Sequence, residues 1–404
     1  MNLHPKKLWN RQFILILGIN FCHQMCQQMM NTLIPQYASS LGASAYAVGL
    51  VSSAFAATSF CVRPIASPAF DSFSKKRLLL VVLAGLLASF VGYSQSRSVA
   101  GILAVRLLHG ACMGCIAPLS LAMAGDSLPD SKLGQGIGIF TLCQAVGQAV
   151  GPSLGLELSR AVGFSNTFLF GAAEIATGIV LAMLLREDSR PRQAYRITLN
   201  KIVEPDAIHP AVILMLQLFA YSCIASYLIT YGTSMGIENI GLFFTVYALF
   251  LLVTRPLSGR LVDRYGYLPL LTLGMSGFAL SFFIIGSSRT IVGMLAAAVV
   301  NAFGYGVCYP TMQSLVISCA PRSKRGAAAS TSFIGADMGM LLGPSLMGLA
   351  IDKIIAVTGD QVAGYSWGFR LMTLPILLGL AYFLVTWKSI RGKIEKHSKE
   401  TEVE

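Results

Sequence analysis

Residues 147–154 read GQAVGPSL, and residues 339–346 read GMLLGPSL. The two stretches lie 192 positions apart (339 − 147 = 192), and the same offset places the pair Arg63-Pro64 onto Arg255-Pro256. Further matches at this offset occur between these points without a gap. Because chance similarity would scatter matches over many offsets, one constant offset indicates that an ancestral unit was duplicated.

The composition is that of a protein surrounded by lipid. Of 404 residues, 54% are hydrophobic and 12% are charged, whereas about 25% of the residues of a soluble domain are charged. The apolar residues form blocks of about 20, the length that a helix needs to cross about 30 Å of hydrocarbon. Twelve blocks fit, centred near Gly18, Ala56, Ala84, Met113, Val146, Ile175, Leu218, Phe250, Phe278, Gly304, Met340 and Leu378. We therefore expect an all-α membrane protein with twelve transmembrane helices in two six-helix pseudo-repeats.

The duplication and the apolar blocks together predict the domain organisation. We expect an N-terminal six-helix bundle over residues 1–185 and a C-terminal six-helix bundle over residues 210–390. The charged residues 186–209, which contain no apolar block, form the predicted cytoplasmic linker. Residues 391–404 form a predicted cytoplasmic tail.

The formal net charge is +12, and its distribution predicts the orientation. Most Lys and Arg residues fall on the side that carries both termini, whereas Arg160 is among the few expected in loops on the other side. This asymmetry follows the positive-inside rule, so both termini are expected in the cytoplasm and the chain in the inner membrane. The same distribution argues against a nucleic-acid partner. We expect a monomer in the lipid bilayer.

We expect neither a metal nor another cofactor. The nine cysteines lie almost entirely within predicted spans, where free Cys behaves as a small apolar residue. The sequence has no GxxxxGK[ST] phosphate loop, so a proton gradient is the expected energy source rather than ATP. No catalytic constellation outside the spans indicates an enzyme.

Two loop segments at the repeat offset, residues 67–76 and 259–266, resemble the cytoplasmic motif GxxxD[RK]xG[RK][RK] of the major facilitator superfamily, although each match is partial. The motif residues, with the Arg of each preceding Arg-Pro pair, are Arg63, Asp71, Lys75, Arg255, Gly259, Asp263 and Arg264. By this resemblance, the Asp closes a gate near the positive end of a neighbouring helix. The alternative is a solvated turn.

The resemblance implies more than the gate. Transporters of this superfamily consist of two parallel six-helix repeats, with the substrate site near the midplane between them. They work by alternating access, as one half rocks against the other. A small-molecule substrate is therefore the expected partner.

The fifth block carries a spacing similar to the helix-5 motif of the superfamily's antiporters. Its residues are Gly138, Gly147, Gly151, Pro152 and Gly155, although Leu156 replaces a final Gly of the motif. Glycines four residues apart let another helix approach closely. The motif favours export, and generic packing of small residues is the alternative.

The first block carries a stripe of polar residues within an arc of about 140°, taking about 100° per residue. The stripe consists of Asn20, His23, Gln24, Gln27, Gln28 and Asn31. Because lipid penalises exposed polar groups, the stripe is expected to face a cavity or other helices.

Four further positions could carry charge within the membrane. Arg106 and His109 are three residues apart and resemble the superfamily's helix-4 motif RxxxG, which is thought to support proton coupling. His109 could carry a proton or could be a structural hydrogen-bonding group like its repeat counterpart Asn301. Asp337 and Glu174 are acids at membrane depth. Asp337 is the better candidate for proton coupling or for pairing with Arg106.

Other polar and aromatic residues are candidates for the wall of a substrate cavity. They are Gln144, Gln148, Gln217, Tyr221, Tyr247, Asn301, Tyr305 and Tyr309. Such a wall suits amphiphilic organic solutes, and ordinary packing is the alternative for each residue.

These features predict a secondary transporter that exports a small organic solute, a drug or metabolite, by proton antiport. A solute–proton symporter of the same fold is the first alternative. A membrane sensor or enzyme without transport is the second.

Overall fold

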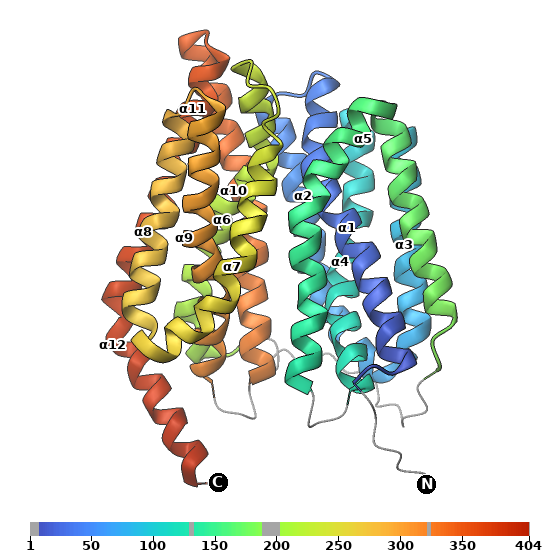
Figure 1. Ribbon diagram of the computed structural model, residues 1–404, viewed down its shortest axis with the longest axis vertical. Coiled ribbons are helices and arrows are strands. Elements are labelled where there is room, and N and C mark those ends of the chain that lie inside the picture. The colour runs from blue at the N-terminus through green and yellow to red at the C-terminus, as the bar shows by residue number, and fades with distance from the viewer. Residues whose placement is uncertain (1–7, 129–132, 188–202, 321–324, 404) are drawn as a thin grey trace. The chain divides into compact units, whose positions relative to one another are not determined.

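The computed structural model of the protein describes residues 8–128, 133–187, 203–320 and 325–403, and within these ranges it contains helices and no strand. The helices (Figure 1) are α1 (Arg11–Ser40), α2 (Ala45–Ser72), α3 (Lys75–Gln95), α4 (Val99–Ser127), α5 (Leu133–Met183), η3 (Pro205–Ala207), α6 (Ile208–Ser234), α7 (Leu242–Tyr265), α8 (Tyr267–Ser287), α9 (Ile291–Ser318), α10 (Arg325–Thr358), α11 (Gln361–Leu371) and α12 (Thr373–Val403). The predicted all-α membrane fold is confirmed.

Helix α5 contains two of the twelve predicted blocks. It runs for 51 residues and leaves helical geometry at Gly163, where φ is 79° and ψ is 164°. Glycine adopts a positive φ easily because it has no Cβ, so α5 bends back on itself there (Figure 1). Arg160, which the sequence places in a loop, lies inside this helix.

Nine helical segments of the described chain are long and apolar enough to cross a membrane. Helix α1 is not among them, because its polar stripe interrupts the apolar sequence. The described part of α7 contributes only the shorter apolar segment Leu242–Thr254. The segment Ala149–Met183 contains the predicted block near Ile175, and the block near Val146 is centred in the same helix, α5, just before this segment. Each of the twelve predicted blocks therefore lies in a helix.

The chain divides into two compact units. The N-terminal unit consists of Met1–Leu41 and Ala57–Ile197, and the C-terminal unit consists of Gly42–Ala56 and Thr198–Glu404. The start of α2 thus belongs to the C-terminal unit. Most of the predicted linker lies outside the described residues.

The start of α2 is held to the C-terminal unit by polar contacts. The Asp352 carboxylate of α10 accepts hydrogen bonds from the Ala45 backbone N–H (3.0 Å) and the Tyr46 backbone N–H (2.9 Å). These are first-turn N–H groups, which have no partner within their own helix. The Tyr227 hydroxyl of α6 also contacts the carbonyl oxygens of Ala45 (2.9 Å) and Pro344 (2.6 Å).

Equivalent helices of the two repeats begin in the same way. The Ser98 hydroxyl accepts from the Gly101 N–H at the start of α4, and the Thr290 hydroxyl accepts from the Gly293 N–H at the start of α9. Both pairs are 192 residues apart. A Ser or Thr N-cap satisfies one first-turn N–H. The duplicated sequence therefore forms duplicated helix ends.

Candidate functional site

The polar stripe of α1 is turned inward within the N-terminal unit. Asn20 is 1% exposed and Gln27 is 7% exposed. The Asn20 amide donates to the Phe140 carbonyl of α5 at 2.9 Å, and the Gln27 amide donates to Asn31 Oδ1 at 3.0 Å. The stripe is therefore largely removed from the unit's surface, and part of it is bonded to α5.

The other members of the stripe differ in burial and bonding. The Asn31 amide donates to Gln28 Oε1 at 3.5 Å, and Gln24 and Gln28 are partly buried. His23 is 1% exposed, and neither of its ring nitrogens has a hydrogen-bond partner among the described residues. An unbonded buried imidazole is costly, which makes His23 the member of the stripe that most needs a partner.

Glu174, in the second half of α5, contacts α1. Its carboxylate accepts a hydrogen bond from the Cys26 thiol at 2.9 Å, and that thiol also contacts the Gly171 carbonyl. At about 100° per residue, Cys26 is about 160° around α1 from Gln24 but only about 60° from His23. Glu174 thus contacts α1 beside the His23 edge of the polar stripe.

Arg106 and His109 lie together in the buried interior of the N-terminal unit. Arg106 is 2% exposed and His109 is 1% exposed. His109 Nδ1 is 3.4 Å from an Arg106 guanidinium nitrogen and 3.1 Å from the Tyr93 hydroxyl of α3. A guanidinium can only donate, so Nδ1 is the acceptor in this contact. The arrangement favours neutral His109 as a structural acceptor.

Asp337 is buried in α10 of the C-terminal unit, with 4% of its surface exposed. Gly335 and Gly339 of the same helix pack against the backbone carbonyls of Ala211 and Met215 in α6. Asp337 is about 200° around α10 from these glycines, at about 100° per residue. It therefore lies on the side of α10 away from the α6 contact.

Aromatic side chains from three helices form a cluster in the C-terminal unit. The rings of Tyr221 (α6) and Tyr305 (α9) stack with centroids 4.0 Å apart and planes at 5°. Tyr309 continues the stack at 5.4 Å from Tyr305, and the Tyr247 ring of α7 lies 6.4 Å from Tyr221. Four of the predicted cavity residues are thus brought together.

A small pocket of about 20 Å³, room for about one water molecule, lies beside this cluster. Its lining residues are Tyr221, Ile224, Ala225, Phe243, Phe244, Tyr247 and Asn301. All seven side chains are uncharged. Gln217, also on α6, is 0% exposed, and both of its amide atoms lack a partner among the described residues.

Asn301 is the amide group of the pocket. It is 0% exposed, and its Nδ2 donates to Ser281 Oγ of α8 at 2.8 Å. Its Oδ1 has no hydrogen-bond partner in the described chain. The side chain thus has one fixed donor and one acceptor still to be satisfied.

The glycine motif of α5 is a packing surface within the N-terminal unit. A Cβ on Gly147 would lie 3.0 Å from the Gln24 carbonyl, and one on Gly151 would lie 2.8 Å from Gln28 Cβ. Gly155 faces Leu33, and Pro152 lies inside the helix. The α5 backbone therefore approaches α1 closely along the polar stripe.

A basic corner (Lys75, Lys76 and Arg77) marks the start of α3. Lys75 Nζ is 2.6 Å from Asp126 Oδ2 near the end of α4, and these side chains are 14% and 29% exposed. This pair joins two helices of the same unit.

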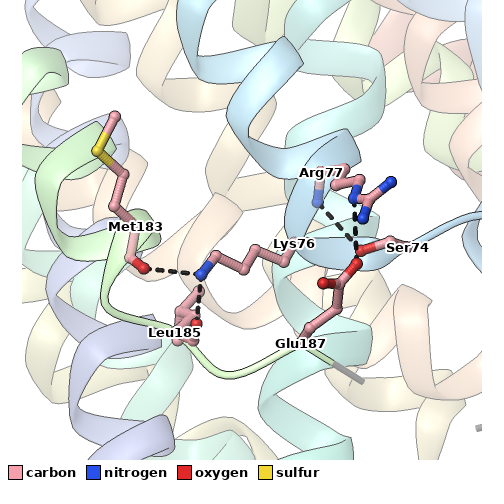
Figure 2. Close-up of polar contacts among 6 residues, drawn as sticks. All are labelled: Ser74, Lys76, Arg77, Met183, Leu185 and Glu187. Carbon is pink, nitrogen blue, oxygen red and sulfur yellow. Dashed lines mark hydrogen bonds and ion pairs between the residues drawn. The ribbon is translucent and has the colours of Figure 1, made fainter. Parts of the chain in front are cut away.

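The other two residues of the basic corner contact the end of α5 (Figure 2). Lys76 Nζ donates to the backbone carbonyls of Met183 (2.7 Å) and Leu185 (2.6 Å). Carbonyls at a helix C-terminus lack partners within the helix and attract cations. Arg77 Nε lies 3.1 Å from Glu187 Oε1.

The remaining motif residues are only partly described. Arg63 Nε donates to Ser59 Oγ at 3.4 Å, and the Arg264 guanidinium lies over the Tyr265 ring at 5.2 Å. The placement of several predicted side chains lies outside what the structure describes, namely those of Asp71, Gly138, Gln144, Gln148, Arg255, Gly259 and Asp263.

The sequence did not single out several partners that the structure reveals. They are Tyr93 beside His109, Ser281 beside Asn301, Asp126 beside Lys75, and Asp352 at the start of α2. The repeat offset did contain a signal for one of these pairs. Asp126 and Ser318 occupy the same repeat position. Asp126 contacts Lys75, the first residue of α3, and Ser318 contacts Tyr267, the first residue of α8.

The fold and these buried polar groups define a class: a helical membrane protein with two related units, each holding polar side chains in an apolar interior. The family model described as Major Facilitator Superfamily matches residues 16–238 and 210–403. The chain belongs to this superfamily and is a multi-pass membrane transporter rather than an enzyme.

Curated relatives match over most of the chain. The multi-drug resistance efflux pump PmrA homolog of Lactococcus lactis is 26% identical, with 91% of this chain and 96% of that protein covered. The staphylopine export protein of Staphylococcus aureus is 20% identical, with 87% and 89% covered.

Solved structures share the fold. The nucleoside transporter NupG, as a mutant, superimposes with a TM-score of 0.78 at 11% identity and covers 93% of this chain and 99% of its own. A POT family transporter in complex with a thioalcohol conjugated peptide gives 0.79 at 14% identity, covering 96% and 98%. At these identities the likeness concerns the fold alone.

Proposed function

We propose that the protein exports a small organic solute, a drug or metabolite, by proton antiport with alternating access. The observation that supports the solute class is the composition of the wall formed by α6, α7 and α9, whose side chains beside the small pocket are aromatic, aliphatic or amide and carry no charge. Ligand pockets of this composition suit largely apolar molecules that a few polar groups orient.

The proposed direction rests on two supports. The spacing of Gly138, Gly147, Gly151-Pro152 and Gly155 resembles that of the superfamily's antiporters. Two relatives that match most of the chain carry names of efflux or export proteins. By the charge distribution we further propose that both termini are cytoplasmic and that the protein lies in the cell membrane.

Asp337 is the proposed proton carrier. Its carboxylate is 4% exposed at membrane depth, where an ionisable group is expensive and is therefore usually functional. Glu174 is a weaker candidate, because its carboxylate already accepts a hydrogen bond from the Cys26 thiol. His109 is weaker too, because Arg106 donates to it.

Proteoliposomes with a trapped pH dye test the proposal. A thermal-shift screen of drugs and metabolites first selects solutes that bind. A gradient of such a solute should then drive protons in the opposite direction, and Asp337→Asn should abolish proton movement while the thermal shift persists. Glu174→Gln is the matched acid-to-amide control and should retain both.

Other outcomes would contradict parts of the proposal. Protons moving with the solute would indicate a symporter. Undiminished proton movement in Asp337→Asn would remove this residue from coupling. In cells, an exporter's solute should accumulate more when an uncoupler collapses the gradient, and lower accumulation would indicate import.

A further inference from the structure

The second half of α5 presents an exposed apolar face. Leu169, Phe170 and Val180 are 46%, 42% and 58% exposed within the apolar span Ala149–Met183. At about 100° per residue, these three side chains fall within an arc of about 100°, which in a membrane faces lipid. Glu174 is about 40° from Phe170, at one edge of the arc, and is itself partly exposed. A lipid-soluble molecule can therefore reach its carboxyl group.

The residues on the other side of this carboxyl group are glycines. Gly171 and Gly178 lie about 60° and 40° around α5 from it, on the side away from Phe170. A Cβ on Gly178 would lie 3.9 Å from Cys22 Cβ of α1, and one on Gly171 would lie 2.6 Å from the Phe90 ring of α3. Since neither glycine has a side chain, neither can cover the carboxyl group.

Within the described chain, the hydrogen-bond partner of Glu174 is the Cys26 thiol of α1. Cys26 Sγ is 2.9 Å from Glu174 Oε2, and it is also 3.4 Å from the Gly171 carbonyl oxygen. Cys26 is 1% exposed, so the sulfur is held against the carboxyl group and is shielded from water. An ionised carboxylate is expensive at membrane depth. A neutral acid beside a neutral thiol is therefore the favourable state of the pair.

We propose that Glu174 and Cys26 form a modification site for lipid-soluble carbodiimides, which convert the pair into a thioester that joins α5 to α1. Carbodiimides react with protonated carboxyl groups, and a neutral one such as dicyclohexylcarbodiimide dissolves in hydrocarbon. The site goes beyond the proposed transport cycle, in which Glu174 has no required role.

The reaction needs no partner beyond the carbodiimide. The carboxyl proton of Glu174 moves to one carbodiimide nitrogen, and a carboxyl oxygen bonds to the central carbon, which gives an O-acylisourea. The Cys26 sulfur then attacks the acyl carbon, and the bond from that carbon to the isourea oxygen breaks. The thiol proton moves to the second nitrogen as dicyclohexylurea leaves. The chain thereby loses the mass of one water molecule.

The contact between the two side chains favours this product over its competitor. An O-acylisourea that meets no nucleophile rearranges to an N-acylurea, which keeps the whole reagent on the carboxyl group. A nucleophile held within about 3–3.5 Å of the reacting atom reacts much faster than one arriving from solution. Because Cys26 Sγ is already 2.9 Å from a carboxyl oxygen, we expect capture by the thiol to win.

Mass spectrometry of the full-length protein in nanodiscs tests the inference. One sample is treated with dicyclohexylcarbodiimide, and another with a cationic, water-soluble carbodiimide. After proteolysis, the peptides that contain Cys26 and Glu174 should be joined, with the loss of one water molecule, in the first sample alone. Neutral hydroxylamine cleaves thioesters and should separate the joined peptides.

Variants assign the two chemical roles. Cys26→Ala keeps the acid but removes the nucleophile, so the Glu174 peptide should instead gain the mass of one whole carbodiimide. Glu174→Gln should remove both products. Cys22→Ala deletes a thiol one helical turn from Cys26 and should leave the joined peptides unchanged. Monodisperse elution of each variant verifies folding.

Several results would overturn the inference. Glu174 that stays unmodified by dicyclohexylcarbodiimide would show that lipid does not give access to it. Equal modification by the water-soluble reagent would show access from water. An N-acylurea alone in the unaltered protein, or joined peptides in Cys26→Ala, would remove Cys26 from the reaction.

Discussion

His109 and Asn301 occupy the same position in the two repeats (301 − 109 = 192), and their surroundings have diverged. Each is buried on the fourth helix of its repeat and contacts the preceding helix, through Tyr93 in one unit and Ser281 in the other. The N-terminal unit adds Arg106, whose counterpart is Ala298. One interior therefore contains a cation, and the other contains a neutral amide beside aromatic rings.

The packing has been retained where the chemistry has changed. Gly151 faces Met25 and Gln28 of α1, and its counterpart Gly343 faces the Phe219 carbonyl of α6. Close backbone approach is a requirement of the bundle itself, so it persists in both copies. Interior polar groups tolerate substitution more readily, so the two repeats can carry different polar groups on the same packing.

The largest expected effect tests the retained packing. In Gly343→Ala the new Cβ would collide with the Phe219 backbone carbonyl, and overpacking of this kind costs about 3 kcal/mol. Gly277→Ala is the control in the same unit, because its Cβ would be 3.7 Å from Gly304. Denaturant titration in mixed micelles should separate the two variants. Equal stability would mean that the close approach is not required.

An intermediate effect tests the diverged interiors. His109→Leu removes the imidazole to which Arg106 donates, and loss of a hydrogen bond to a charged group costs about 2 kcal/mol. Asn301→Leu should cost about 0.5 kcal/mol, because the Ser281 hydroxyl keeps its bond to the Phe278 carbonyl. The same titration measures both. Similar losses would show that the cation adds nothing to the N-terminal interior.

The smallest effect concerns the corners that open the third helix of each repeat. Lys75 pairs with Asp126, and at the same positions the Tyr267 hydroxyl contacts Ser318 (3.1 Å) and also Ser314. Asp126→Asn should lower the free energy of unfolding by about 1 kcal/mol, and by somewhat less at high salt, because salt partly screens a half-buried ion pair.

Tyr267→Phe is the matched test in the C-terminal unit. This substitution should lower the free energy of unfolding by about 0.5 kcal/mol at any salt concentration, because the contact that it removes is between uncharged hydroxyl groups. Thermal unfolding at two salt concentrations distinguishes the variants. A salt-independent loss in Asp126→Asn would contradict the ion-pair interpretation.

The fold could be predicted because lipid imposes strong rules on a sequence. Apolar blocks, the constant offset and the paired glycine motifs are readable along the chain, and all twelve blocks lie in helices. Gly163 was not singled out, because the polar residues around Arg160 predict a loop, whereas the chain turns within α5 at this one residue. Arg160 made the same region look like a loop.

The candidate site could be predicted only in part, because contacts between distant segments have no periodic signal. The tyrosines that the sequence predicts for the cavity wall do lie together. The contact of Glu174 with Cys26 of α1, and the pairing of Lys75 with Asp126, depend on which helices become neighbours. The roles of the predicted site residues in transport remain predictions.

Helix α2 contributes residues to both units. Its first turn, at Ala45 and Tyr46, is anchored by the Asp352 carboxylate, whereas from Ala57 onward it belongs to the N-terminal unit. The Asp352 hydrogen bonds therefore fix the first turn of α2 within the C-terminal unit, although the rest of the helix belongs to the N-terminal unit.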